Sequence, residues 1–204
     1  MNVNTKRLAL SGVIAALYVA LTYAVLPLAS GAIQFRLSEG LTLLPLIFPE
    51  AIVGVFVGCL LSNLITGCAI WDIVFGSLIT LIAGILTFII GKVIKKMPLK
   101  IFVGGLFPVL LNAIFLPVIW YFTNGELEYL YYIQVAFLIL GQSVSVYLIG
   151  TVLVLEINKR IIKNNGKESK TENEETIEGV LEEKSEQESK QESNIPPIEV
   201  ERKE

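Results

Sequence analysis

The sequence contains no histidine and only two cysteines. Without histidine it can form neither an HExxH zinc motif nor a Ser/His/Asp triad, and it has no CxxC pair. Cys59 and Cys68 lie nine positions apart in apolar surroundings, which is typical of buried free thiols. Hydrolysis by two paired acids would need Asp72 to work with Glu39 or Glu50, and no spacing motif supports such a pair. We therefore expect no enzyme activity, no metal site and no cofactor of the chain's own.

Charge is scarce as well. Only 17% of the 204 residues are charged and 53% are hydrophobic, with a mean hydropathy of +0.66. Soluble domains average about 25% charged residues, so the composition excludes a cytosolic globular protein. The charge is also unevenly spread, because residues 1–163 hold ten basic and six acidic residues, whereas residues 164–204 hold six and thirteen. The net charge of −3 is therefore the sum of a basic membrane domain and an acidic tail. This net charge gives no sign of nucleic-acid binding.

Long uncharged runs are abundant and predict an all-α integral membrane protein. A bilayer requires about 20 apolar residues per helix, and Leu8–Leu28 meets this length. That run exceeds the apolar region of a signal peptide, about 7–15 residues, so we interpret it as a retained span. Within a membrane domain over residues 1–163, the predicted spans are about residues 8–28, 39–49, 51–66, 72–94, 101–122 and 131–157.

The stretch Leu41–Trp71 is open to two interpretations, one long helix or two short ones. Two helices give six spans with cytoplasmic N and C termini, and then nine Lys/Arg lie inside and only Arg36 lies outside. One helix gives five spans, with eight Lys/Arg inside. A single membrane helix would also contain Pro45, Pro49 and an unpaired Glu50, at considerable cost. Six spans are therefore favoured.

The acidic tail, residues 164–204, is rich in Glu, Lys, Ser, Gln and Asn and has no aromatic residue. Such a composition buries too little apolar surface to offset the entropy of ordering. We expect a disordered cytosolic tail, either simply solvated or carrying a short docking motif at Ile195-Pro-Pro-Ile-Glu-Val.

The polar residues of the membrane domain collect at its outer end in the six-span arrangement. Polar groups at membrane depth are costly and usually face a partner or a cavity. Together with aromatic rings they predict an outward-open pocket for a small, polar, planar ligand. The candidate binding residues are Gln34, Arg36, Glu39, Asn63, Asp72, Asn112, Trp120 and Gln134.

Most of these residues also have a local alternative explanation. Arg36 and Glu39, three positions apart, would suit a surface ion pair. Asp72 would suit a solvated helix N-cap, and Asn63 could cap the backbone or hold two helices together. An interfacial aromatic belt would account for Trp120, Tyr121, Tyr131 and Tyr132.

The first span carries a stripe of small residues with a period of four, namely Gly12, Ala16, Ala20 and Ala24. Such stripes allow another helix to approach closely in lipid. From spacing alone, that helix could belong to a partner protein or to this protein's own bundle.

Four segments resemble the QueT family, the substrate-binding S components of energy-coupling factor (ECF) transporters for queuosine precursors. The similarity covers about residues 5–160 and excludes the acidic tail. The segments are Gln34-Phe-Arg-Leu-Ser-Glu39, Leu43-Leu-Pro45, Gly58-Cys-Leu-Leu-Ser-Asn63 and Asp72-Ile-Val-Phe-Gly-Ser-Leu-Ile-Thr80.

The resemblance implies a six-helix S component in the bacterial cell membrane. Such a subunit binds a vitamin or related metabolite from outside. It then docks on a transmembrane T component with two ABC-type ATPases, which use the ATP, and topples to release its substrate. The usual docking surface is an alanine motif in the first span, which maps here onto Ala16-x-x-x-Ala20, extended by Gly12 and Ala24.

The implied cargo is a queuosine precursor, a 7-deazaguanine base or queuine. A carboxylate such as Glu39 or Asp72 could accept the N–H groups of its guanine-like edge, and an aminomethyl cation on the base would pair with the other acid. Other readings stay open, namely an S component for another vitamin or heterocycle, and a membrane scaffold or sensor acting through the tail. A stand-alone carrier is disfavoured because no inverted repeat is detectable. For the deazaguanine, amides at Asn63, Asn112 or Gln134 could meet the ring carbonyl, and Trp120 or a tyrosine could stack on the ring.

Overall fold

The computed structural model describes residues 3–26, 35–127 and 129–164. Over these ranges it is helical without any strand, which confirms the predicted all-α class. The chain divides into a compact unit over residues 1–158 and a second over residues 159–204, of which residues 159–164 are described. Gln34 and the predicted disordered tail beyond residue 164 lie outside the described residues.

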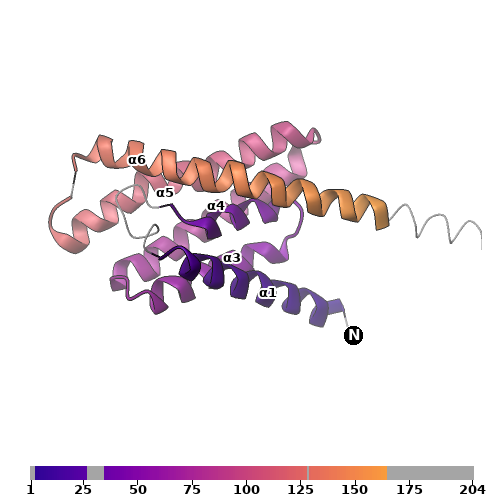
Figure 1. The fold of residues 1–204 in the computed structure, drawn as a ribbon, viewed down its shortest axis with the longest axis horizontal. Helices are drawn as coiled ribbons and strands as arrows, with labels where there is room; N and C mark the ends of the chain where they lie inside the picture. Colours follow the sequence, from indigo (N-terminus) through magenta and orange to yellow (C-terminus); the bar gives the residue numbers. More distant parts are fainter. Residues whose placement is uncertain (1–2, 27–34, 128, 165–204) are drawn as a thin grey trace, which may run out of the picture. The chain divides into compact units, whose positions relative to one another are not determined.

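Figure 1 shows the helical elements of the described residues in chain order. Three of them depart from α-helical geometry, one as a 3-10 helix and two as π-helical stretches inside longer helices. In chain order they are α1 (Val3–Ala24), the 3-10 helix η1 (Leu37–Leu46), α3 (Glu50–Ile65), the π-helical η2 (Asp72–Gly76) leading into α4 (Ser77–Val93), α5 (Met97–Asn124), and α6 (Tyr131–Ser143) leading into the π-helical η3 (Val144–Gly150).

Four helices are long and apolar enough to cross a membrane, namely Asn4–Ala24, Asp72–Val93, Met97–Asn124 and Tyr131–Asn164. The apolar helix α3 is shorter, with 16 residues. At 1.5 Å per residue it measures about 24 Å, less than the roughly 30 Å of a bilayer's hydrocarbon core. A membrane protein is thus supported, while six spans with cytoplasmic termini stay a prediction.

Helix α5 begins four residues before the predicted span 101–122 and ends two residues after it. Pro98 lies in its first turn, where the missing N–H has no intrahelical partner to lose. At the other end Gly125 adopts the left-handed conformation, with φ 79°, and its N–H donates to the Tyr121 carbonyl. That conformation favours glycine and ends the helix.

Element η1 lies in the interior rather than on the lipid-facing surface. Every residue from Ser38 to Leu46 is buried, and the element packs against α4 and η3 as well as α1. Ten residues at about 2.0 Å each give only about 20 Å. Because η1 ends at Leu46 and α3 starts at Glu50, the alternative of one continuous helix over Leu41–Trp71 is wrong.

Close helix approaches depend on glycine at several places, among them Gly150 at η1 and Gly58 at the first helix. A Cβ atom on Gly150 would lie 2.6 Å from the carbonyl oxygen of Gly40, so the residue allows η1 to pack directly on η3. A Cβ on Gly58 would lie 2.6 Å from Cβ of Tyr18, so it allows α3 to pack along α1 (Figure 1). Small residues at such contacts are the usual means of helix packing in lipid.

Candidate substrate-binding site

A cluster of polar side chains lies where the start of η1, the C-terminal part of α3, η2 and the C-terminal half of α5 meet. Six of the eight predicted binding residues belong to it. Gln34 is outside the described residues, and Gln134 is buried on α6 but is not among the lining residues. The cluster is lined by Arg36, Glu39, Cys59, Asn63, Asp72, Gly76, Thr80, Asn112, Leu116 and Trp120.

Glu39 is the deepest charged group of this cluster, with only 2% of its surface exposed. Its Oε1 accepts a 2.7 Å hydrogen bond from the Tyr18 hydroxyl, and its Oε2 accepts a 3.3 Å bond from Nδ2 of Asn112. The alternative of a surface ion pair with Arg36 is therefore wrong for Glu39. The carboxylate is held instead by neutral donors from α1 and α5.

Arg36 reaches across the connection to α3. Its Nη1 donates to Oδ1 of Asn63 at 3.5 Å, a long and hence weak hydrogen bond. The Asn63 amide in turn donates to the main-chain oxygen of Asp72 at 3.2 Å. Asn63 thus joins α3 to η2, as predicted by the alternative that it holds two helices together, and this contact lies inside the cluster. Nε of Arg36 is buried without a hydrogen-bond partner.

Asp72 lies inside a helix, in the π-helical stretch η2, rather than at an N-cap. The N-cap interpretation is therefore wrong. Its carboxylate accepts a hydrogen bond from the Trp120 indole N–H, which comes from the far end of α5. Oδ1 of Asp72 is nevertheless buried without a partner. Single π-helical turns are often found at functional sites, and this one supplies both Asp72 and Gly76 to the cluster.

The side chains of the cluster fill it almost completely. The free space between them is about 10 Å³, room for about one water molecule. A heterocycle therefore fits only if some of these side chains move apart. At 3.5 Å the Arg36–Asn63 contact is the longest of the described nitrogen–oxygen hydrogen bonds between the lining residues.

Larger hollows exist on the surface between α5 and the helix that η2 and α4 form, but they are apolar. One of about 420 Å³ is lined by Trp71, Phe75, Val118, Ile119 and Phe122. Such surfaces on membrane-crossing helices suit contact with lipid tails. They offer few groups that could orient a polar ligand, so the polar cluster is the better candidate site.

The predicted aromatic residues divide into two groups. Trp120 is half-buried and lines the cluster. Tyr121, Tyr131 and Tyr132 are 54%, 42% and 68% exposed, as an interfacial belt would be.

Two contacts in the cluster come from residues that were not predicted to bind the ligand. Tyr18 is buried against Glu39. The hydroxyl of Thr80 donates to Sγ of Cys59 at 3.4 Å. Cys59 and Cys68 are both free, and only Cys59 is fully buried. The sequence did hold a signal for both residues. Tyr18 and Thr80 lie within the predicted spans 8–28 and 72–94, and a hydroxyl at membrane depth needs a hydrogen-bond partner.

Comparison with protein families matches residues 8–159, or 152 of the 204 residues, to the QueT transporter family. The chain belongs to the QueT transporter family. No curated protein and no solved structure matched in the corresponding comparisons. As a QueT transporter, the chain is a membrane protein with a small-molecule substrate.

The small-residue stripe of this QueT protein is exposed along its whole length. Gly12, Ala16, Ala20 and Ala24 are all exposed on α1, and a Cβ on Gly12 would meet nothing within 4 Å. Packing within the protein's own bundle, the second interpretation of the stripe, is therefore wrong in this structure. The bundle packs on the other side of α1, through Tyr18 and Thr22 among others.

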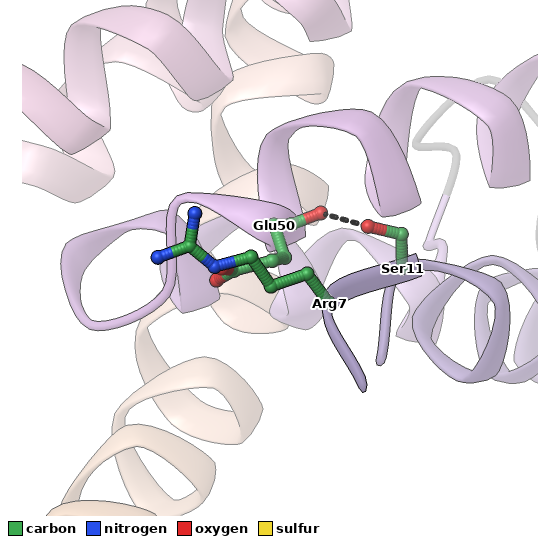
Figure 2. A network of polar contacts seen from close by, with 3 residues as sticks. All are labelled: Arg7, Ser11 and Glu50. Atoms are coloured by element: carbon green, nitrogen blue, oxygen red, sulfur yellow. Dashed lines mark hydrogen bonds and ion pairs between the residues drawn. The ribbon is translucent and has the colours of Figure 1, made fainter. Parts of the chain in front are cut away.

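The opposite end of the QueT domain holds a second polar group of residues. Nε of Arg7 lies 3.2 Å from Oε1 of Glu50, and the Ser11 hydroxyl donates to the main-chain oxygen of Glu50 at 2.8 Å (Figure 2). Glu50 is thus paired. The six-span arrangement requires Arg7 and Glu50 to share one end and the candidate site to lie at the other, which agrees with these contacts.

Proposed function

We propose that this chain is the substrate-binding S component of an ATP-driven ECF-type uptake transporter. It binds its ligand from the outer face of the cell membrane and delivers it through partner subunits. The ligand is a queuosine precursor, a 7-deazaguanine base or queuine.

The observation that carries the proposal is the buried mixed-charge cluster of a QueT-family protein. One guanidinium, two carboxylates and two amides converge there beside an indole ring. A 7-deazaguanine presents N–H donors, a ring carbonyl and a flat π surface. These are the features that carboxylates, amide or guanidinium donors and Trp120 would recognise.

The proposed assembly adds a T component and two ABC-type ATPases. The exposed stripe on α1 supports this part, because an uncovered face of small residues suits close approach by a partner helix. ATP would be bound and hydrolysed by the ATPases, so this chain would need no cofactor of its own.

The test is thermal stabilisation of the full chain in detergent against 7-deazaguanine bases, queuine, guanine and several vitamins. A ligand that binds only the folded state adds about 2.7 kcal/mol at 100 times its dissociation constant. Glu39→Ala and Asp72→Ala are each expected to abolish the shift given by the 7-aminomethyl base while the protein still folds. Normal binding by both variants would place the pocket elsewhere.

Two other outcomes would revise the proposal. A shift with one vitamin alone would keep the S component and replace its cargo. A folded protein that responds to nothing would favour a scaffold or sensor acting through the tail. Deletion of residues 164–204 separates these classes further, because the transporter predicts unchanged uptake and the sensor predicts loss of function.

A further inference from the structure

The connection between α4 and α5 carries charge of one sign. Residues 73–125 contain four lysines and no other charged residue, namely Lys92, Lys95, Lys96 and Lys100. All four fall within nine positions, around the three residues that join the two helices. The first three are exposed and Lys100 is half-buried. We call these four residues the lysine cluster.

The lysine cluster lies at the end of the bundle away from the candidate site. The helix Asp72–Val93 has 22 residues. At 1.5 Å per residue it measures about 33 Å, close to the thickness of a bilayer's hydrocarbon core. The candidate site takes Asp72 from one end of this helix, and the lysine cluster begins at the other. There a Cβ atom on Gly91 would lie 2.7 Å from the main-chain oxygen of Leu46, at the end of η1 that leads to Glu50. The six-span arrangement predicts this end to be cytoplasmic.

The charge of the lysine cluster is not neutralised by acidic side chains of the described residues. Within residues 3–26, 35–127 and 129–164, no carboxylate oxygen lies within 4.0 Å of a nitrogen of these four lysines. Nζ of Lys92 lies 5.3 Å from the centre of the Phe88 ring, a cation–π contact that holds the ammonium group in place and leaves its charge intact. Like charges so close together repel one another, so an anion from outside the described residues would stabilise this surface.

Apolar side chains are exposed among the lysines. Val93, Leu99 and Phe102 are 70%, 49% and 57% exposed. The Phe102 ring stacks on the Tyr147 ring with 6.1 Å between their centres, so it is held against the bundle. An acidic protein partner would use the lysines and leave these apolar side chains without a match. A phospholipid with an anionic headgroup and apolar chains matches both.

We propose that the lysine cluster binds an anionic phospholipid of the leaflet that it faces. Lys95 and Lys96 hold the phosphate of the headgroup, and the three exposed apolar side chains contact the acyl chains. Clusters of about four to eight basic residues next to a membrane-crossing helix are typical of anionic-lipid binding. Lysine acts in such a site as a point charge on a flexible stem. This inference goes beyond the proposed function, since it depends neither on the cargo nor on the partner subunits.

The experiment titrates the full chain in neutral detergent with phosphatidylglycerol, which is anionic, or with phosphatidylcholine, which is zwitterionic, both with the same acyl chains. Native mass spectrometry measures the lipid bound at each concentration. A lysine close to an anionic headgroup contributes about fivefold in affinity, so we expect phosphatidylglycerol to bind more tightly by on the order of 20-fold or more. In Lys95→Gln combined with Lys96→Gln, this preference is expected to fall by on the order of 10-fold.

A matched control removes two positive charges outside the cluster, in Lys159→Gln combined with Lys163→Gln, and should change the preference by less than about threefold. Equal losses in the two double variants would overturn the inference, because the attraction would then follow the net charge of the protein. Equal affinity of the unmodified chain for the two lipids would overturn it as well, and this comparison needs no variant.

Two further outcomes would assign the lysine cluster to another occupant and so overturn the inference. If glycerol 3-phosphate displaces phosphatidylglycerol at the same concentration, the acyl chains contribute nothing and the site is one for a soluble phosphate. If the Lys95→Gln, Lys96→Gln variant loses a co-purifying protein while its lipid preference is unchanged, the lysines belong to a protein contact.

Discussion

The Tyr18 hydroxyl donates a 2.7 Å hydrogen bond to Oε1 of Glu39, joining the C-terminal half of α1 to the candidate site. One turn further along α1, the Thr22 hydroxyl donates to Oγ of Ser38 at 2.8 Å. All four side chains are buried. The first helix is thus tied to the site by two polar contacts on one face, while its small-residue stripe faces outward.

Replacing Tyr18 by Phe should destabilise the protein. The change keeps the ring but removes the donor, so a buried carboxylate oxygen loses its partner, at a cost of about 1–3 kcal/mol. The measurement is thermal unfolding of the purified chain in detergent. Tyr23→Phe is the control, since Tyr23 lies on the same helix and is 62% exposed. Equal stability of both variants would show that the Tyr18–Glu39 bond contributes little.

Much of the site could be predicted because polar residues are conspicuous in an apolar sequence. Asp72 and Asn112 stand in long runs of aliphatic side chains, where each must find a partner. That argument uses no information about which face of a helix each residue occupies. Six of the eight residues it selects nevertheless lie together in the polar cluster. It fails to distinguish Gln134, which is equally polar and buried but lies on α6, a helix that contributes no lining residue.

Other features depend on tertiary contacts, which cannot be deduced from the spacing of residues in the sequence. The i,i+3 spacing of Arg36 and Glu39 suggests a local pair, yet Glu39 is held by Asn112, 73 positions away. Tyr18 is one of seven tyrosines, and only the packing of α1 on α3 shows that its hydroxyl faces inward. Over ten residues, the apolar pattern of Leu37–Leu46 does not separate a 3-10 helix from an α-helix, because their periods differ by only 0.6 residue per turn.

Replacing glycine by alanine should have opposite effects on stability at two positions of the helix bundle. At Gly58 the new Cβ would lie 2.6 Å from Cβ of Tyr18, so Gly58→Ala should force α1 and α3 apart and cost about 1–3 kcal/mol. At Gly12 the Cβ would meet open space, so Gly12→Ala should be neutral or stabilise by up to about 1 kcal/mol through helix propensity. Unfolding temperatures of the two variants test this pair. Similar values for both would contradict the close packing of α1 on α3.

The two cysteines should differ in reactivity. Cys59 is buried at 2% exposure, with Asn63 and Thr80 donating toward its sulfur, whereas Cys68 is only partly buried, beside the Thr66 hydroxyl. Because alkylation requires access to the thiolate, N-ethylmaleimide should modify Cys68 first and Cys59 only slowly. Mass spectrometry over a time course gives the two rates, with unfolded protein as the reference for full labelling. Labelling of Cys59 at the rate of Cys68 would mean that the site opens freely without ligand.

Larger side chains in the small-residue stripe of α1 should impair docking of the proposed partner subunits without affecting ligand binding. In Ala16→Leu combined with Ala20→Leu, the new side chains point away from the bundle, so folding and ligand affinity should be unchanged. Close approach by a helix of the proposed T component would be blocked, since added volume keeps the two backbones apart. Co-purification with the T component and ATPases measures docking, and Ile82→Phe, at a 51% exposed position on α4, controls for a bulky change elsewhere. Undiminished recovery of the complex with the double variant would show that the partner binds a different face.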